Sequence, residues 1–173
     1  MAGDTGSGEA WAAWSAAARA MAEPGQPAPL FAALDHGLRR TVGHKLFTIL
    51  LLRPDTNESE RIYTNMPDAY PVSGRKPRRE TPWTARVFDR GEVFIGYTAD
   101  DIRAHFPDHE LILSLGCAAI MNLPVRYAGE TLGTLNVLHE ADWYDEPKAA
   151  LGRPFAALAV PAFLALRGQI DGP

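Results

Sequence analysis

The stretch GCAAIMNLPVRYAGETLGTLNVLH, residues 116–139, contains two apolar runs separated by one short polar turn. Apolar runs of this length that flank a turn with glycine are typical of a β-hairpin. We therefore predict strands over 118–127 and 131–139, joined by a three-residue loop. In that register Asn122 lies opposite Asn136, and Ala119 lies opposite His139.

The two faces of this hairpin differ in chemistry, because successive side chains of a strand point to opposite sides. One face is almost entirely apolar, and we expect it to pack on helices. The other carries both asparagines among small residues, and we expect it to line a cavity. A buried amide needs hydrogen-bond partners, so the two asparagines either satisfy each other within the sheet or recognise a ligand.

The rest of the sequence completes an α+β domain. Apolar runs predict strands over 44–52, 61–65 and 93–96, and helical periodicity predicts helices over 9–22, 28–41 and 145–167. Thr81 and Thr98 are suited to cap shorter helices over 81–89 and 99–105, and 108–115 adds a further turn. Pro154 and Pro161 predict a break or kink in the last helix. This order favours an antiparallel sheet with the N- and C-terminal helices on one face and a capped pocket on the other.

Composition restricts the class of protein. The formal net charge of −4 and pI near 5.7 argue against nucleic-acid binding, which needs a concentrated basic surface. The single cysteine excludes an intramolecular disulfide, and residues 1–14 do not resemble a secretion signal. The sequence contains no apolar stretch of the ~18 residues that a membrane span needs. We expect a cytoplasmic protein without a membrane partner.

A basic cluster at Arg75, Lys76, Arg78 and Arg79 precedes the helix start at Thr81. It is either a solvated surface loop or a flap that brings positive charge to an anionic ligand. The interpretation as a flap is favoured by the helix start that follows, because the exposed N–H groups there also bind anions.

The hairpin resembles that of GAF domains in three places: Asn122-Leu123-Pro124-Val125, the turn at Gly129-Glu130, and the strand Leu132-Gly133-Thr134-Leu135-Asn136-Val137. The similarity in element order extends from about residue 30 to residue 166. The resemblance implies a GAF/PAS-like fold with a small-molecule ligand between the sheet and its cap, and a homodimer formed through the first and last helices. We divide the chain into an N-terminal helix and linker at 1–27, a GAF domain at 28–167 and a disordered tail at 168–173.

The sequence lacks the key residues of more narrowly defined groups of GAF domains. The segment after the hairpin, HEADWYDE, differs from the motif of cyclic-nucleotide-binding GAF domains, and Cys117 precedes a strand rather than lying in the helical Cys-His context of bilin attachment. Free-methionine sulfoxide reductases are distantly similar, but they use several cysteines, and one of their pocket acids aligns with Asn136. None of these activities is expected, and the sequence does not identify a cofactor.

The resemblance and the predicted faces together suggest a standalone sensor or regulatory subunit that binds a small anionic or heteroaromatic metabolite and acts through a protein partner. The candidate ligand-binding residues are Tyr63, Asn65, Arg78, Arg79, Trp83, Tyr97, Asn122 and Asn136. No metal site is expected, because Pro107 keeps His105 and His109 from sharing a regular helix face.

Two alternatives remain open from the sequence. In the first, the protein is a small enzyme in which Cys117 is a nucleophile and His139 its base, since the predicted register makes them diagonal neighbours. Against this, a lone cysteine among small residues is more often a buried hydrophobic side chain. In the second, the protein is a dimerisation module without a ligand.

Overall fold

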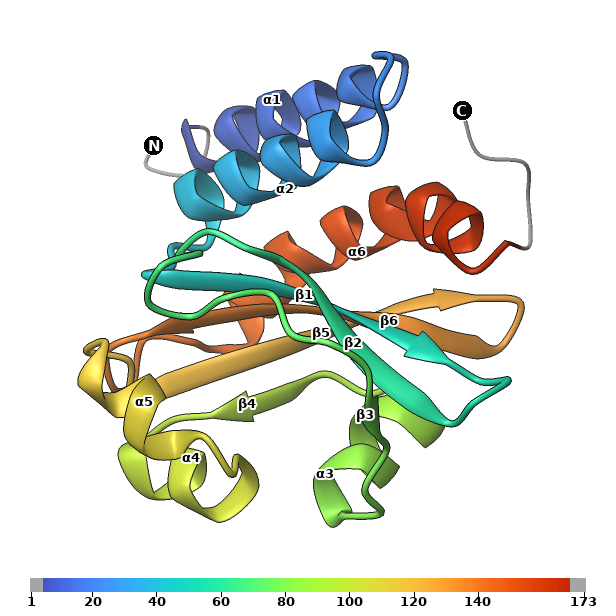
Figure 1. Cartoon of the computed structure of the whole chain (residues 1–173). Helices are drawn as coiled ribbons and strands as arrows, with labels where there is room; N and C mark the ends of the chain where they lie inside the picture. The colour runs from blue at the N-terminus through green and yellow to red at the C-terminus, as the bar shows by residue number, and fades with distance from the viewer. Residues whose placement is uncertain (1–4, 169–173) are drawn as a thin grey trace.

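One antiparallel sheet organises the computed structural model, which describes residues 5–168 (Figure 1). The sheet has six strands in the order β3-β2-β1-β6-β5-β4. Their bounds are β1 Leu46–Arg53, β2 Glu58–Thr64, β3 Lys76–Pro77, β4 Phe94–Gly96, β5 Ala119–Tyr127 and β6 Glu130–His139. The predicted strands are all present, and β3 adds a short edge within the segment that was expected to be loop.

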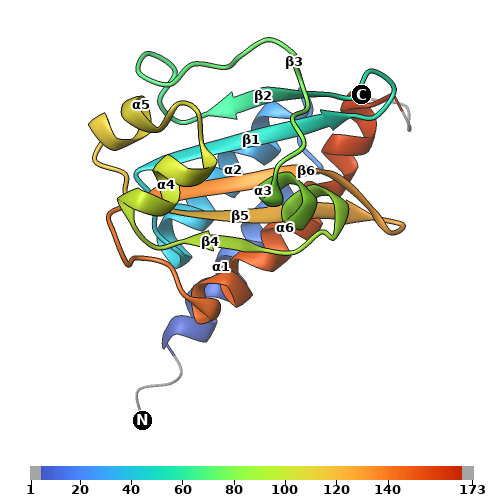
Figure 2. The same ribbon diagram turned by 90° about the horizontal axis from the view of Figure 1, so that it is seen from below.

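Helices cover both faces of the sheet in different ways. The long helices α1 Thr5–Ala20, α2 Ala28–Thr41 and α6 Glu146–Leu166 lie on one face (Figure 1). The short helices α3 Pro82–Thr84, η1 Ala85–Asp89, α4 Ala99–His105 and α5 His109–Ser114 lie on the other (Figure 2). The predicted α+β arrangement, with terminal helices on one side and a cap on the other, is confirmed.

The central hairpin has the predicted register but a different turn. Asn122 pairs with Asn136 and Ala119 pairs with His139, as expected. The loop is shorter than predicted, because Tyr127 pairs with Glu130 and leaves Ala128 and Gly129 as a two-residue turn at φ 49° and 82°. Such turns with positive φ match the twist of paired strands. A bulge after Val125 absorbs the extra residue and restores the pairing of the asparagines.

The apolar face of the hairpin packs on the long helices. Leu123, Leu135 and Val137 belong to the same buried cluster as Leu34 of α2 and Phe155 of α6. The helix predicted over 9–22 is observed as α1 Thr5–Ala20. It is the alanine face of α1 (Ala10, Ala13 and Ala17) that is buried, whereas the side chain of Trp11 is 70% exposed.

The last helix is continuous through both of its prolines, so the predicted break is absent, and the alternative of a kink stays a prediction. Phe155, Ala159 and Phe163 recur at helical spacing and are fully buried, which holds α6 on the sheet across Pro161. This helix is long and apolar enough to cross a membrane by length and composition alone. Its buried residues belong to the core between the sheet and α2.

Candidate ligand site

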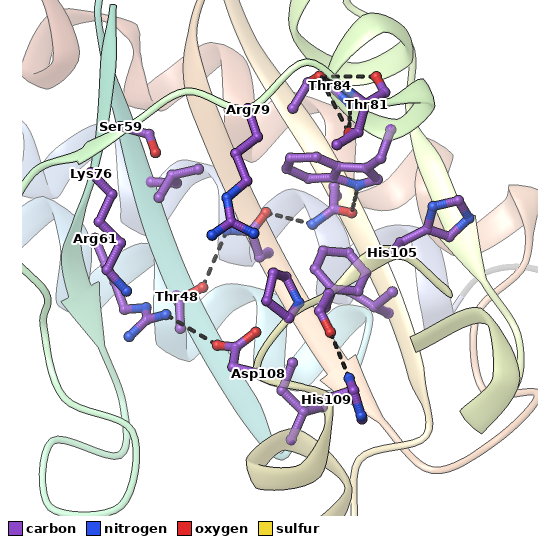
Figure 3. Close-up of a pocket in the computed structure, with 18 of the residues that line it drawn as sticks. Thr48, Ser59, Arg61, Lys76, Arg79, Thr81, Thr84, His105, Asp108 and His109 are labelled. Atoms are coloured by element: carbon purple, nitrogen blue, oxygen red, sulfur yellow. Dashed lines mark hydrogen bonds and ion pairs between the residues drawn. The ribbon is translucent and has the colours of Figure 1, made fainter. Parts of the chain in front are cut away.

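A cavity of about 800 Å³ lies between the sheet and the short helices (Figure 3). Its volume is in the range of cavities that hold small molecules. Strands β1, β2, β5 and β6 contribute to the lining, and the cap contributes residues from β3, α3, α4 and the start of α5. The polar face of the hairpin therefore lines a cavity, as the alternation of its side chains predicts.

A chain of hydrogen bonds crosses the floor of this cavity. The Trp83 indole N–H donates to Asn122 Oδ1 at 3.0 Å, and Asn122 Nδ2 donates to Asn136 Oδ1 at 2.7 Å. Asn136 Nδ2 then donates to Thr48 Oγ1 at 3.2 Å. The asparagines are almost completely buried, with 1% and 8% of their surface exposed. Because an amide nitrogen carries two hydrogens, Asn136 keeps one N–H and Thr48 keeps its O–H for a ligand.

The cap begins where Thr81 starts the helix. Its hydroxyl accepts from the backbone N–H of Thr84, and the Thr84 hydroxyl accepts from the backbone N–H of Thr81 in return. This capping box confirms the predicted helix start and fixes Trp83 above the floor. The indole packs edge-on against Phe88 and Phe106, with ring centroids 4.9 and 5.5 Å away. Trp83 thus joins the aromatic cap to the amide floor.

Arg79 reaches over the floor from the segment that precedes Thr81 (Figure 3). Within residues 5–168 its guanidinium has no carboxylate or hydrogen-bond partner. Arg78 differs, because its guanidinium pairs with Asp89 and lies 5.5 Å from the Phe88 ring centroid. Of these two arginines, Arg79 is the one whose charge remains available to a ligand.

At the other end of the cavity, Arg61 and Tyr70 share the carboxylate of Asp108. The Tyr70 hydroxyl donates to Asp108, and an Arg61 guanidinium nitrogen lies 3.6 Å from the same carboxylate oxygen. The guanidinium also lies 3.9 Å from the centroid of the Tyr70 ring, a cation–π geometry. Burial and the nearby Asp108 charge raise the pKa of Tyr70, which keeps the phenol protonated as a donor.

Comparison with known sequences identifies the family of this chain. Residues 31–163 match the sequence model of the GAF domain. The chain belongs to the GAF domain family. No curated protein sequence matches it significantly. The recognition of this family from the hairpin motif is therefore confirmed.

Solved structures share the fold at low sequence identity. The GAF domain of an Acinetobacter phosphoenolpyruvate-protein phosphotransferase has a TM-score of 0.71 at 10% identity, covering 94% of this chain and 96% of that one. A free methionine-R-sulfoxide reductase from Neisseria meningitidis has a TM-score of 0.68 at 18% identity, covering 98% and 96%. The GAF domain of a Bacillus halodurans two-component sensor histidine kinase has a TM-score of 0.62 at 18% identity, covering 80% and 95%. These likenesses establish the fold of this GAF domain and leave its ligand open.

Arg78, Arg79, Trp83, Asn122 and Asn136 line the cavity of this GAF domain, and their role in binding remains a prediction. Tyr63, Asn65 and Tyr97 do not line it. The Tyr63 hydroxyl donates to Asp35 Oδ2 of α2 at 2.7 Å, on the face of the long helices. Asn65 accepts from the backbone N–H of Phe47 and donates to the carbonyl of Lys45, and Tyr97 is 47% exposed.

A β-bulge in β2 explains the misplacement of Tyr63. Tyr63 pairs with Ile49, but the next partner, Leu50, pairs with Arg61, so Ile62 is an extra residue. The bulge reverses the alternation, and Arg61 faces the cavity while Tyr63 faces the helices. Arg61, Asp108 and Thr48 are cavity residues that the sequence analysis missed. Their proximity depends on strand pairing and cap folding that no local pattern encodes.

Cys117 and His139 are not placed as a nucleophile and base. Cys117 is buried in the apolar cluster on the cap side of the sheet, and burial raises the pKa of its thiol. The His139 ring stacks on Trp143 with centroids 3.6 Å apart, and its Nδ1 accepts from the backbone N–H of Glu140. Neither residue lines the cavity. The geometry therefore gives no support to the alternative enzymatic reading, in which these residues share the cavity.

Proposed function

We propose that this GAF domain binds a small anionic metabolite, with heteroaromatic compounds as an alternative class, and acts as a sensor or regulatory subunit. The observation that carries the proposal is Arg79, a guanidinium without a partner in the described chain that reaches over a floor of hydrogen-bond donors. Arginine binds carboxylates and phosphates with two parallel hydrogen bonds. Asn136 and Thr48 supply further donors, and Trp83 supplies an aromatic surface.

The test compares Arg79→Gln with Arg75→Gln by isothermal titration calorimetry with benzoate and isophthalate as probes. Arg75 is a matched control because it belongs to the same basic cluster but pairs with Glu60 outside the cavity. We expect Arg79→Gln to weaken binding by about tenfold or more, since it removes a charge-assisted pair. Equal affinities for the two variants would contradict the role of Arg79. Native mass spectrometry of the freshly purified protein shows in parallel whether an anion copurifies.

We also propose that the protein works as a homodimer through its long helices. Trp11 supports this, because 70% of its surface is exposed and its helix α1 lies on the side of the sheet opposite the short helices of the cap. Large exposed aromatic side chains are enriched in protein interfaces. In analytical ultracentrifugation we expect a dimer for the wild-type protein and a shift towards monomer for Trp11→Ser. A monomer at every concentration of the wild-type protein would exclude this proposal.

A further inference from the structure

The arginine and lysine side chains that line the cavity fall into two groups according to their ion pairs. Arg78 pairs with Asp89, and Arg103 pairs with Asp100 at 2.7 Å. These pairs are electrically neutral as units, and their carboxylates are more than half exposed. They contribute little net charge to the interior of the cavity.

The positive charges of the second group are not balanced by carboxylates. Arg61, Lys76 and Arg79 all line the cavity, and the carboxylate facing them among the described lining residues is that of Asp108. Lys76 and Arg79 have no ion pair within residues 5–168. Three positive charges against one negative charge leave a surplus of two. A ligand that neutralises this surplus carries two negative charges.

Two of the cations lie at the same end of the cavity. Lys76 pairs with Ser59 across the β2–β3 ladder, and Ser59 and Arg61 are two residues apart on the same face of β2. The side chains of Lys76 and Arg61 are therefore diagonal neighbours. Arg79 lies above the amide floor instead (Figure 3). The positive charge is thus distributed over two positions, which suits two separate acidic groups.

Arg61 is held in place without Asp108. Its Nη1 donates to the carbonyl of Pro71 at 2.8 Å, and its guanidinium rests on the Tyr70 ring. The contact with Asp108 is longer, 3.6 Å between Nη2 and Oδ2, and the Asp108 side chain is 41% exposed. A guanidinium has five N–H donors, so most of those on Arg61 remain open. An incoming carboxylate or phosphate can make the shorter, paired contact that Asp108 does not make.

We infer that the ligand is a dianion whose first acidic group binds Arg79 and whose second binds Arg61 and Lys76, the position that Asp108 now partly neutralises. Asp108 then acts as a resident competitor for the second acidic group of the ligand. This inference rests on the proposed function and deepens it by giving the ligand class.

The experiment uses two matched pairs of probes in calorimetry with the full chain. Isophthalate is compared with 3-carbamoylbenzoate, in which a neutral amide replaces one carboxylate, and phenyl phosphate at pH 8 is compared with its methyl ester. We expect at least one dianion to bind about tenfold more tightly than its singly charged partner. Arg61→Gln should abolish that preference. Thermal unfolding of the same sample distinguishes loss of binding from loss of folding.

Asp108→Asn gives a test in the opposite direction. The amide keeps an acceptor for the Tyr70 hydroxyl but removes the charge from Arg61. We expect the dianion to bind several-fold more tightly to this variant, with a smaller change for the monoanion. Asp55→Asn makes the same change of charge in an exposed turn outside the cavity and should leave the preference unchanged.

The outcomes separate the two proposals. Equal affinity for the members of each probe pair, or an equal gain for both members in Asp108→Asn, overturns the dianion inference while Arg79-dependent anion binding stands. If no probe binds and native mass spectrometry finds no copurifying anion, the proposed anion-binding function itself fails.

Discussion

At the scale of single residues, Asn122 is the centre of the polar floor. Its carbonyl accepts from Trp83 and its amide nitrogen donates to Asn136, at a site with 1% exposure. Asn122→Leu leaves the Asn136 carbonyl without its donor and the Trp83 indole N–H without its acceptor. We expect a loss of about 1–3 kcal/mol in the free energy of unfolding, measured by urea titration.

The double variant Asn122→Leu/Asn136→Leu sharpens this test. It removes both partners of the buried amide pair, so no polar atom of the pair is left unsatisfied. Its cost should therefore be smaller than the sum of the two single costs. Strict additivity would mean that the two amides do not depend on each other.

The site residues also show which parts of the cavity could be predicted from the sequence alone. Asn122 and Asn136 were predictable as neighbours because they belong to one hairpin with a recognisable turn. Trp83 and Arg79 were identifiable from the helix start at Thr81, which is a local signal. Arg61 was not, because the bulge at Ile62 that turns its side chain to the cavity arises from pairing with β1, a distant segment.

At the scale of elements, the contact between β1 and β6 explains the glycine of the hairpin motif. Gly133 pairs with Leu51, and a Cβ built on it would lie 2.0 Å from the Leu50 carbonyl oxygen and 2.5 Å from the Phe163 ring. The first obstacle is backbone, so it cannot move aside without disturbing the central strands. The glycine is therefore required by the close approach of β1 and by the packing of α6.

Gly133→Ala is expected to destabilise the protein by at least about 3 kcal/mol, since overpacking at a central strand pair displaces backbone. Gly74→Ala is the matched control, because a Cβ there meets no atom within 4 Å. It should change the free energy of unfolding by less than about 0.5 kcal/mol. Chemical denaturation of both variants gives the comparison, and a mild effect at Gly133 would show that the strands separate more easily than the structure indicates.

Elements defined by local patterns were predicted well, and elements that depend on tertiary contacts were not. The caps at Thr81 and Thr98 are both observed as capping boxes. The continuity of α6 through Pro154 and Pro161 was missed, because burial of the helix on the sheet outweighs the local cost of proline. The short edge strand β3 also escaped prediction, since two residues carry no periodicity.

At the scale of the whole molecule, the sheet separates two polar systems. The cavity lies on the cap side, whereas Asp35 of α2 lies on the side of the long helices and ties that layer to the sheet. Asp35 Oδ1 lies 3.0 Å from His44 Nε2, and Asp35 Oδ2 accepts from the Tyr63 hydroxyl at 2.7 Å. These contacts connect α2 to the start of β1 and to β2.

The charge of Asp35 makes this connection sensitive to acid. Burial by itself would raise the pKa of Asp35, but the hydrogen bonds from His44 and Tyr63 and the charges of His44 and Arg39 outweigh it, and the net pKa is lowered from 3.8. A carboxyl whose pKa is lower in the folded state stabilises the fold above its unfolded pKa. That contribution is lost as the pH falls through the folded pKa.

Asp35→Asn should therefore cost about 1–2 kcal/mol near pH 5, where the wild-type carboxylate makes charge-assisted hydrogen bonds. The difference between wild type and variant should shrink steadily as the pH falls from 3.8 through the lower folded pKa, because the carboxyl becomes protonated and is then neutral like the amide. Urea titrations at constant ionic strength from about pH 5 down to about pH 2.5 measure this difference. Asp55→Asn, in the exposed turn between β1 and β2, controls for the removal of a surface charge. A difference that stays constant across the range would mean that the Asp35 charge does not hold α2 to the sheet, and that the apolar packing of Leu34 and Phe31 is sufficient to do so.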